Sequence, residues 1–277
     1  MRVEFYCPRW GAEDIDWDTF LRQVEEAGYS GIEWFPNGEN SDAAMVVQLL
    51  MKYNLKYSIV MTVTGKFSGF QQYSKDLKIQ LASLAGTGKG LLPPLFISAQ
   101  VGREFFNAEE IDQCIECCRQ ISRDSGIPVY QETHRNKWPY AVHILPPVLK
   151  NNPDILLTLD ISHWFCVSES YLEDQQEAVQ LAISRTRHVH ARIGHTQGSQ
   201  VVDPALPEYA DALEAHLKVW DRWISNNKKE GVEICTITPE FGPPPYLTPL
   251  NNNVNVQQQQ WKLNLWMKDL LQSRYNL

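Results

Sequence analysis

Four side chains that can bind a metal ion lie at the ends of short apolar runs. They are Glu132 in PVYQETHR, Asp160 in LLTLDISHW, His190 in RHVHARIGH and Glu240 in TITPEFGP. An aspartate that ends a buried run needs a cation, a set of donors or a metal, because an isolated buried carboxylate is strongly destabilising. Three carboxylates and one imidazole suit one divalent cation, with Mn²⁺ as the first candidate and Mg²⁺, Co²⁺ and Zn²⁺ as alternatives.

The elements that must position these residues follow a regular alternation. Short runs rich in β-branched residues alternate with longer amphipathic runs, which predicts parallel strands joined by crossover helices. The eight runs expected to form strands are 3–7, 31–35, 56–62, 95–100, 128–132, 155–160, 188–192 and 233–240. Helices are expected at 17–28, 42–53, 108–126 and 258–274. The pattern predicts the α/β class and a single (β/α)8 TIM-barrel domain over residues 1–277.

A barrel of this kind would bring the four residues together. The C-terminal ends of parallel strands meet at one mouth, where barrel enzymes carry their sites. Side-chain alternation places His188, His190 and Arg192 on one face of their strand. Thr238 and Glu240 likewise share one face of theirs. Each of these residues alone would suit a salt bridge or an ordinary hydrogen bond, but their arrival on successive strands favours a site.

Composition excludes several classes of partner. The formal net charge of −8 gives no basic field to attract a phosphate backbone, so we expect no nucleic acid partner. No apolar run of membrane-spanning length occurs, and the segment MRVEFYCPRWGAED lacks the apolar core of a signal peptide. We therefore expect no membrane partner and a cytoplasmic location, and a homo-oligomer is compatible with the sequence. The Cys114-x-x-Cys117 spacing lies in a helical repeat that also buries Cys118, so we expect packing rather than metal binding there.

The four motifs also resemble a known family. QETHR, LDISHW, HVHAR and TPEFGP, in that order, resemble the xylose isomerase-like TIM barrel superfamily of sugar phosphate isomerases and epimerases. Its members include ketose 3-epimerases, hydroxypyruvate isomerase, inosose dehydratase and endonuclease IV. The resemblance covers essentially the whole chain. Its most recognisable element is D-x-x-H, formed here by Asp160 and His163. The segment GYSGIEWFP is similar to the family's N-terminal pattern.

The resemblance implies a mechanism. In the family's isomerases a divalent ion holds two adjacent oxygens of an open-chain sugar and stabilises the enediolate formed when a carbon proton is removed. Carried onto this chain, the metal ligands are Glu132, Asp160, His190 and Glu240. Glu132 and Glu240 would also form the acid/base pair, one removing the proton and the other returning it.

Further residues near the motifs would contact a small sugar or sugar-phosphate substrate. The polar candidates are His163, Arg192, His134 and Arg135, and the apolar wall would come from Trp10 and Trp34, with Trp138 as a further candidate. Salt bridges in the loop and support of the carboxylates are equally good interpretations of His134 and Arg135. Tryptophan is also common core material.

Three alternatives stay open. An inosose-type dehydratase would use the same metal and the same proton abstraction. An endonuclease IV-like phosphodiesterase is disfavoured by the acidic charge and by MTVTGK and ISAQVGRE, which lack the histidines that endonuclease IV uses as extra ligands. A non-catalytic binding barrel would hold no metal.

Overall fold

Eight parallel strands close into a barrel in the computed structural model, which describes residues 1–248 and 255–275. Each strand pairs with its neighbours in sequence, and β1 pairs with β8. The strands are β1 Arg2–Pro8, β2 Gly31–Trp34, β3 Lys56–Thr62, β4 Ile97–Gln100, β5 Val129–Glu132, β6 Leu157–Leu159, β7 Thr186–Ala191 and β8 Ile234–Pro239. The predicted (β/α)8 class is confirmed.

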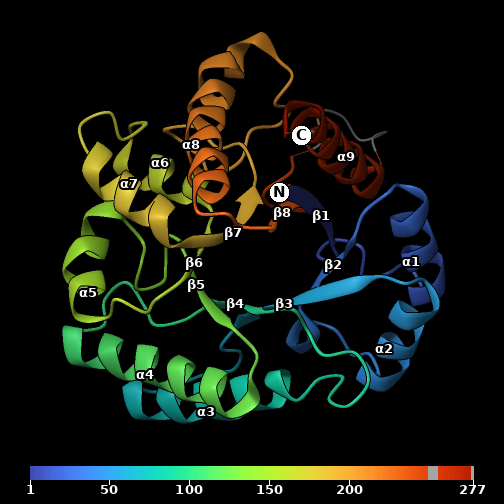
Figure 1. Ribbon diagram of the computed structural model, residues 1–277, viewed down its shortest axis with the longest axis horizontal. Coiled ribbons are helices and arrows are strands. Elements are labelled where there is room, and N and C mark those ends of the chain that lie inside the picture. The colour runs from blue at the N-terminus through green and yellow to red at the C-terminus, as the bar shows by residue number, and fades with distance from the viewer. Residues whose placement is uncertain (249–254, 276–277) are drawn as a thin grey trace.

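The helices form a ring outside the strands (Figure 1). They are α1 Trp17–Glu26, α2 Ala43–Lys52, α3 Phe70–Ala85, α4 Ala108–Ser125, α5 Leu145–Asn151, α6 Ile161–Ser168, α7 Gln176–Arg185, α8 Ala210–Lys229 and α9 Val256–Tyr275, with 3-10 turns at Pro36–Gly38, Val142–Ile144 and Pro207–Tyr209. The four predicted helices correspond to α1, α2, α4 and α9. No helix in the described part of the chain is long and apolar enough to cross a membrane.

The sixth strand is shorter than the predicted 155–160. It ends at Leu159, because Asp160 leaves the strand and caps α6, where its side chain accepts a hydrogen bond from the Ser162 backbone N–H at 3.0 Å. Glu240 similarly lies one residue beyond β8. Both carboxylates therefore stand in the turns at the barrel mouth rather than in the strands.

The strand faces that point into the barrel carry many polar side chains. The register pairs Glu33 with Ser58, His188 with Thr236 and His190 with Thr238, so these residues share the inner face. The apolar core lies between the outer strand faces and the helices. There Cys114 and Cys118 of α4 are almost completely buried, which confirms the packing interpretation of these cysteines.

His216 of α8, which lies outside the barrel mouth, makes the stability of the fold depend on pH. Its ring is fully buried against Phe165 and Trp220, and Nδ1 contacts the Ala212 carbonyl at 2.8 Å. Burial lowers the pKa of His216 to about 4. The unfolded histidine, with a pKa of about 6.5, binds a proton that the folded one does not, so stability falls as the pH falls from 6.5 toward 4.

We expect His216→Leu to remove this part of the pH dependence. Between pH 7 and 4.5 the free energy of unfolding should fall by about 2 kcal/mol less in the variant than in the wild type. Urea unfolding at several pH values measures both curves, and the other buried histidines cancel in the difference. Parallel curves for the two proteins would contradict the assignment.

Candidate metal centre at the barrel mouth

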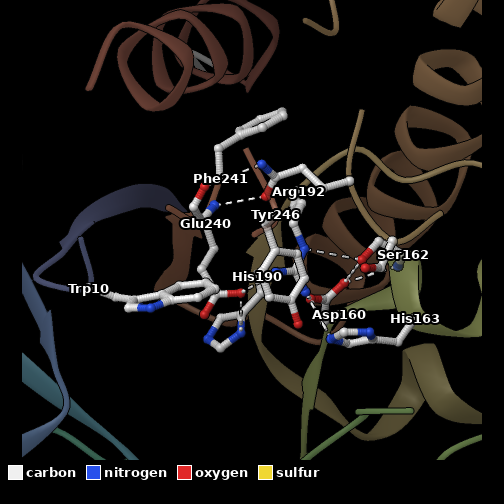
Figure 2. A network of polar contacts seen from close by, with 12 residues as sticks. Trp10, Asp160, Ser162, His163, His190, Arg192, Glu240, Phe241 and Tyr246 are labelled. Atoms are coloured by element: carbon white, nitrogen blue, oxygen red, sulfur yellow. Dashed lines mark hydrogen bonds and ion pairs between the residues drawn. The ribbon is translucent and has the colours of Figure 1, made fainter. Parts of the chain in front are cut away.

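The structure brings the four predicted metal ligands to one place at the barrel mouth. His190 Nδ1 lies 3.7 Å from Glu132 Oε1 and 3.3 Å from Glu240 Oε2. Asp160, His190 and Glu240 each offer a ligand atom within 4.8 Å of the others (Figure 2). Strand β7 and the turns after β6 and β8 thus supply three ligand atoms around one position, and Glu132 of β5 approaches this group through its contact with His190.

The contacts of the two ring nitrogens of His190 indicate whether a cation fits among these residues. His190 Nδ1 is buried and has no hydrogen-bond partner among the described residues. Its other nitrogen, Nε2, lies 2.7 Å from Glu33 Oε1. When Nε2–H donates to Glu33, Nδ1 presents its lone pair to the carboxylates of Glu132 and Glu240, which is the arrangement of a metal-binding histidine. The donor set therefore fits a divalent ion.

The electrostatics also favour positive charge there. Burial alone would lower the pKa of His190, but the charges of Glu240, Glu33 and Glu132 raise it well above its ordinary value. Burial raises the pKa of both Glu132 and Asp160, against the effect of nearby cations. A divalent ion among these groups would let the carboxylates stay ionised.

Asp160 has more partners than the sequence suggests. Oδ1 accepts from the Ser162 backbone N–H at 3.0 Å and from its hydroxyl at 2.5 Å. Oδ2 forms an ion pair with Arg192, which is 2% exposed and also approaches Glu240 Oε2 at 3.8 Å (Figure 2). Ser162 and Arg192 thus supply the donors and the cation that a buried aspartate needs, so its burial does not by itself require a metal. A carboxylate oxygen has two lone pairs, so the ion pair leaves room for metal binding.

Glu33 adjoins the candidate metal centre, and the sequence analysis did not predict it there. Its carboxylate contacts His190 Nε2 and, at 3.2 Å, His188 Nε2, and it accepts from Thr238 Oγ1 at 3.3 Å. Although burial opposes it, the charges of His190 and His188 hold the pKa of Glu33 well below its usual range. The hydrogen bond of this histidine joins His190 Nε2 to Glu33 Oε2 at 3.2 Å. We interpret Glu33, His188 and His190 as a network that orients the ligand histidine. The available signal was a glutamate inside the apolar run GIEWF.

Glu33→Gln tests this orienting role. We expect the variant to bind Mn²⁺ about 10- to 100-fold more weakly, because a neutral amide holds the imidazole less firmly and makes Nδ1 less basic. Calorimetric titration of the metal-free protein gives the affinity, and a thermal melt checks the fold. Glu177→Gln, on the exposed face of α7, is the matched control. Equal Mn²⁺ affinity in wild type and Glu33→Gln would be evidence against the network.

A cavity of about 190 Å³ opens beside Glu132 and Glu240, two of the four predicted ligands. It is lined by Pro8, Trp10, Glu33, Phe35, Val60, Thr62, Gln100, Glu132, His134, Arg192, Glu240 and Tyr246. A larger cavity of about 600 Å³ lies between α1 and α9, but none of the predicted ligands lines it. The smaller cavity is therefore the candidate site, because predicted metal ligands line it and none lines the larger one.

Three of the predicted substrate contacts line this cavity, namely Trp10, His134 and Arg192. Trp10 packs edge-on against Tyr246, with ring centroids 5.4 Å apart, and forms one wall (Figure 2). His134 Nδ1 is buried without a hydrogen-bond partner among the described residues. Burial and nearby cations lower the pKa of His134 well below its ordinary value, so the ring presents a neutral polar edge.

His163 lies behind the cavity rather than in it. It is fully buried, with Nε2 at 2.8 Å from Arg192 Nη2 and Nδ1 at 3.1 Å from Arg135 Nη1. Burial and these cations lower the pKa of His163 well below its ordinary value, so the ring is neutral. The predicted direct contact of His163 with a substrate oxygen is therefore replaced by contacts with two arginines.

The tryptophan predictions are partly wrong. Trp34 does not line the cavity, because Glu33 faces inward and the next residue of a strand must face outward. Its indole packs in the outer layer against Trp17 of α1 at 5.4 Å. Trp138 is also core, and its Nε1–H donates to Gln131 Oε1 at 3.0 Å.

Two further residues near the site were not predicted. Lys137 is 8% exposed, and its Nζ donates to the hydroxyl of Thr62 in the cavity wall at 2.7 Å. Burial lowers the pKa of Lys137 to about 8. Tyr246 places its ring against the guanidinium groups of Arg192 and Arg135, at 4.9 Å and 5.2 Å. Both residues come from loops, where no periodic pattern indicates position.

Comparison with known proteins supports the fold. No protein-family model matches the sequence, and no curated protein sequence matches it. The IolI protein with a bound zinc atom is 14% identical with a TM-score of 0.64 over 100% of both chains. The probable 3-DHS dehydratase AsbF from Bacillus anthracis is 17% identical, TM-score 0.61, over 98% of this chain and 99% of that one. D-psicose 3-epimerase, solved with D-fructose, is 10% identical, TM-score 0.63, over 99% of each.

These similarities establish a fold class. The chain has the fold of the xylose isomerase-like TIM barrels, as its motifs predict. At such identities a reaction does not transfer with the fold, because one barrel supports many chemistries. The activity must therefore be argued from the site.

Proposed function

We propose that the protein is a divalent-metal-dependent isomerase or epimerase of a sugar or sugar phosphate. One observation carries the proposal: the buried Nδ1 of His190 has no hydrogen-bond partner among the described residues and faces the carboxylates of Glu132 and Glu240. This cluster adjoins a cavity of about 190 Å³. D-psicose 3-epimerase and the zinc-bound IolI protein, which share the fold, support the choice of sugar and metal.

In the proposed site Glu132, Asp160, His190 and Glu240 hold one divalent ion per chain. Mn²⁺ is the first candidate, and Mg²⁺, Co²⁺ and Zn²⁺ are alternatives, because three carboxylates and one imidazole suit each of them. When bound, the ion supplies the fixed positive charge that stabilises the oxyanion of an enediolate.

The chain's own residues supply the proton transfer. Glu132 accepts hydrogen bonds from Gln100 Nε2 at 2.8 Å and Ser98 Oγ at 3.1 Å, which fix the carboxylate at the cavity wall. Burial raises its pKa, which brings a carboxyl group closer to the range in which it both takes and returns a proton. Glu240, on the turn after β8, is the second member of the pair. Trp10, His134 and Arg192 position the substrate.

An inosose-type dehydratase is the second candidate. Its reaction needs an acid that protonates a leaving hydroxyl after the carbon proton is removed. Lys137, with a pKa lowered to about 8 and its Nζ 2.7 Å from Thr62 Oγ1 in the cavity wall, is such an acid. AsbF, which shares the fold, is described as a probable dehydratase.

Proton exchange tests the proposal. The Mn²⁺-loaded protein is incubated in D₂O with ketoses and ketose phosphates, and carbon-bound protons are followed by NMR. We expect one carbon position to exchange while an epimer or isomer accumulates, only when metal is present. A product lighter by one water would favour the dehydratase. Absence of exchange across the panel with a fully loaded protein would contradict both reactions.

A further inference from the structure

Arg135 is a half-buried cation that contacts two hydroxyl groups and a histidine ring. It lies three residues after Glu132 in the loop that follows β5. Its Nη1 donates to Ser199 Oγ at 2.6 Å, and its Nη2 donates to Tyr246 Oη at 3.1 Å. Among residues 1–248 and 255–275, no carboxylate forms a salt bridge with it. The more deeply buried Arg9 and Arg192 differ in this respect, because each pairs with an acid.

The remaining contact of Arg135 leaves it with spare donors. Arg135 Nη1 approaches Nδ1 of the His163 ring at 3.1 Å, and Arg192 Nη2 approaches Nε2 of the same ring at 2.8 Å, although a histidine ring offers at most one acceptor nitrogen. Both arginines are donors, so only one of these contacts can be a hydrogen bond. A partly desolvated guanidinium with unused N–H groups and no counter-charge is a favourable place for an anion.

The surroundings of Arg135 connect it to the candidate metal centre. Arg135, Ser199, Gln200, Pro245 and Tyr246 line an open pocket of about 220 Å³. Tyr246 also lines the cavity beside Glu132 and Glu240, so its ring is a wall common to both spaces. The two spaces adjoin at Tyr246, so a molecule whose reacting carbon lies between the two glutamates would pass this side chain to reach Arg135.

We propose that Arg135, with the hydroxyl groups of Ser199 and Tyr246, binds an anionic group at the end of the substrate remote from the reacting carbon. A carboxylate and a phosphate share the required chemistry, since the oxygens of either accept from the guanidinium fork. Arg192 is less suited, because Asp160 and Glu240 already compensate its charge. The inference rests on the proposed function and narrows its substrate to a phosphorylated or acidic sugar.

Binding of simple anions tests the subsite without knowledge of the substrate. The metal-loaded, full-length protein is titrated calorimetrically with inorganic phosphate and with acetate. Arg135→Gln should weaken binding of the preferred anion about 10-fold or more, and Arg135→Lys should recover part of the loss. Arg123→Gln, an exposed arginine of α4, is the matched control and should bind like the wild type. Absence of binding to the wild type, or equal binding by Arg135→Gln, would overturn the proposal.

A comparison of neutral and anionic substrates tests the anion subsite separately from the proposed isomerase activity. Ketoses are compared in D₂O as the free sugar, its terminal phosphate ester and its terminal carboxylate. The wild type should favour one anionic series, and which one identifies the source of the anion. Arg135→Gln should raise KM for that series about 10-fold or more, and should raise KM for the free sugars much less, so that the preference for the anionic series is lost.

Two outcomes distinguish the two proposals. Equal turnover of free and anionic sugars that Arg135→Gln does not change would overturn the anion subsite and leave the isomerase standing. Exchange in none of the three series, together with phosphate binding that depends on Arg135, would support the subsite and contradict the proposed reaction.

Discussion

We expect Glu240→Gln to lower the rate of substrate proton exchange by about 10³-fold. The substitution removes one carboxylate of the proposed acid/base pair, and general acid–base catalysis of this kind contributes about 10² to 10⁴ in rate. It also removes a charge beside His190 Nδ1, which lies 3.3 Å from Glu240 Oε2, so metal affinity should fall as well. Rates are measured at saturating Mn²⁺, so that the loss of a proton-transfer group is not confused with the loss of metal.

The control for Glu240→Gln is Glu177→Gln, which removes the same charge from the exposed face of α7. It should exchange substrate protons at the wild-type rate. If Glu240→Gln keeps its rate within about tenfold of the wild type while fully loaded with metal, Glu240 is outside the proton-transfer pair.

We expect Asp160→Asn to destabilise the metal-free protein by about 3 kcal/mol. Breaking a buried ion pair by removing one partner leaves an uncompensated charge, here that of Arg192, whose remaining acid Glu240 lies 3.8 Å away. Asparagine still caps a helix, so the start of α6 is preserved and the loss reports mainly on the ion pair. Urea unfolding in the presence of a chelator gives the free energy.

A double-mutant cycle separates the pair from other effects of Asp160→Asn. Arg192→Met leaves Asp160 as the uncompensated charge, whereas the double variant removes both charges. The double variant should therefore be less destabilised than the sum of the single variants. Additive losses, or a loss below about 1 kcal/mol for Asp160→Asn, would show that the pair contributes little.

The barrel could be predicted because each of its strands carries its own signal. Apolar runs and intervening amphipathic runs are local features, and β3 has the predicted bounds 56–62. The end of the sixth strand was harder to predict from the sequence, because Asp160 is both the residue after the strand and the N-cap of the next helix. A strand-end carboxylate and an N-cap aspartate look alike in sequence.

The candidate site could be predicted only in part. Side-chain alternation identifies the inward residues of β7 and β8, and applied to β2 it would also separate inward Glu33 from outward Trp34. Which inward residue faces which depends on barrel register, so the contact of Glu33 with His190 required the structure. Arg135 and Tyr246 are 111 residues apart in two loops, and no periodicity predicts such a contact.

Elemental analysis tests the central claim most directly: Glu132, Asp160, His190 and Glu240 hold one divalent ion. The protein is purified without chelator, reconstituted with Mn²⁺, and compared with Glu240→Gln and Asp160→Asn. The site predicts about one Mn, Co, Zn or Mg per wild-type chain, and sharply less in both variants. Metal content that stays near zero in the reconstituted wild type, or that is equal in all three proteins, would contradict the site and the enzymatic function proposed from it.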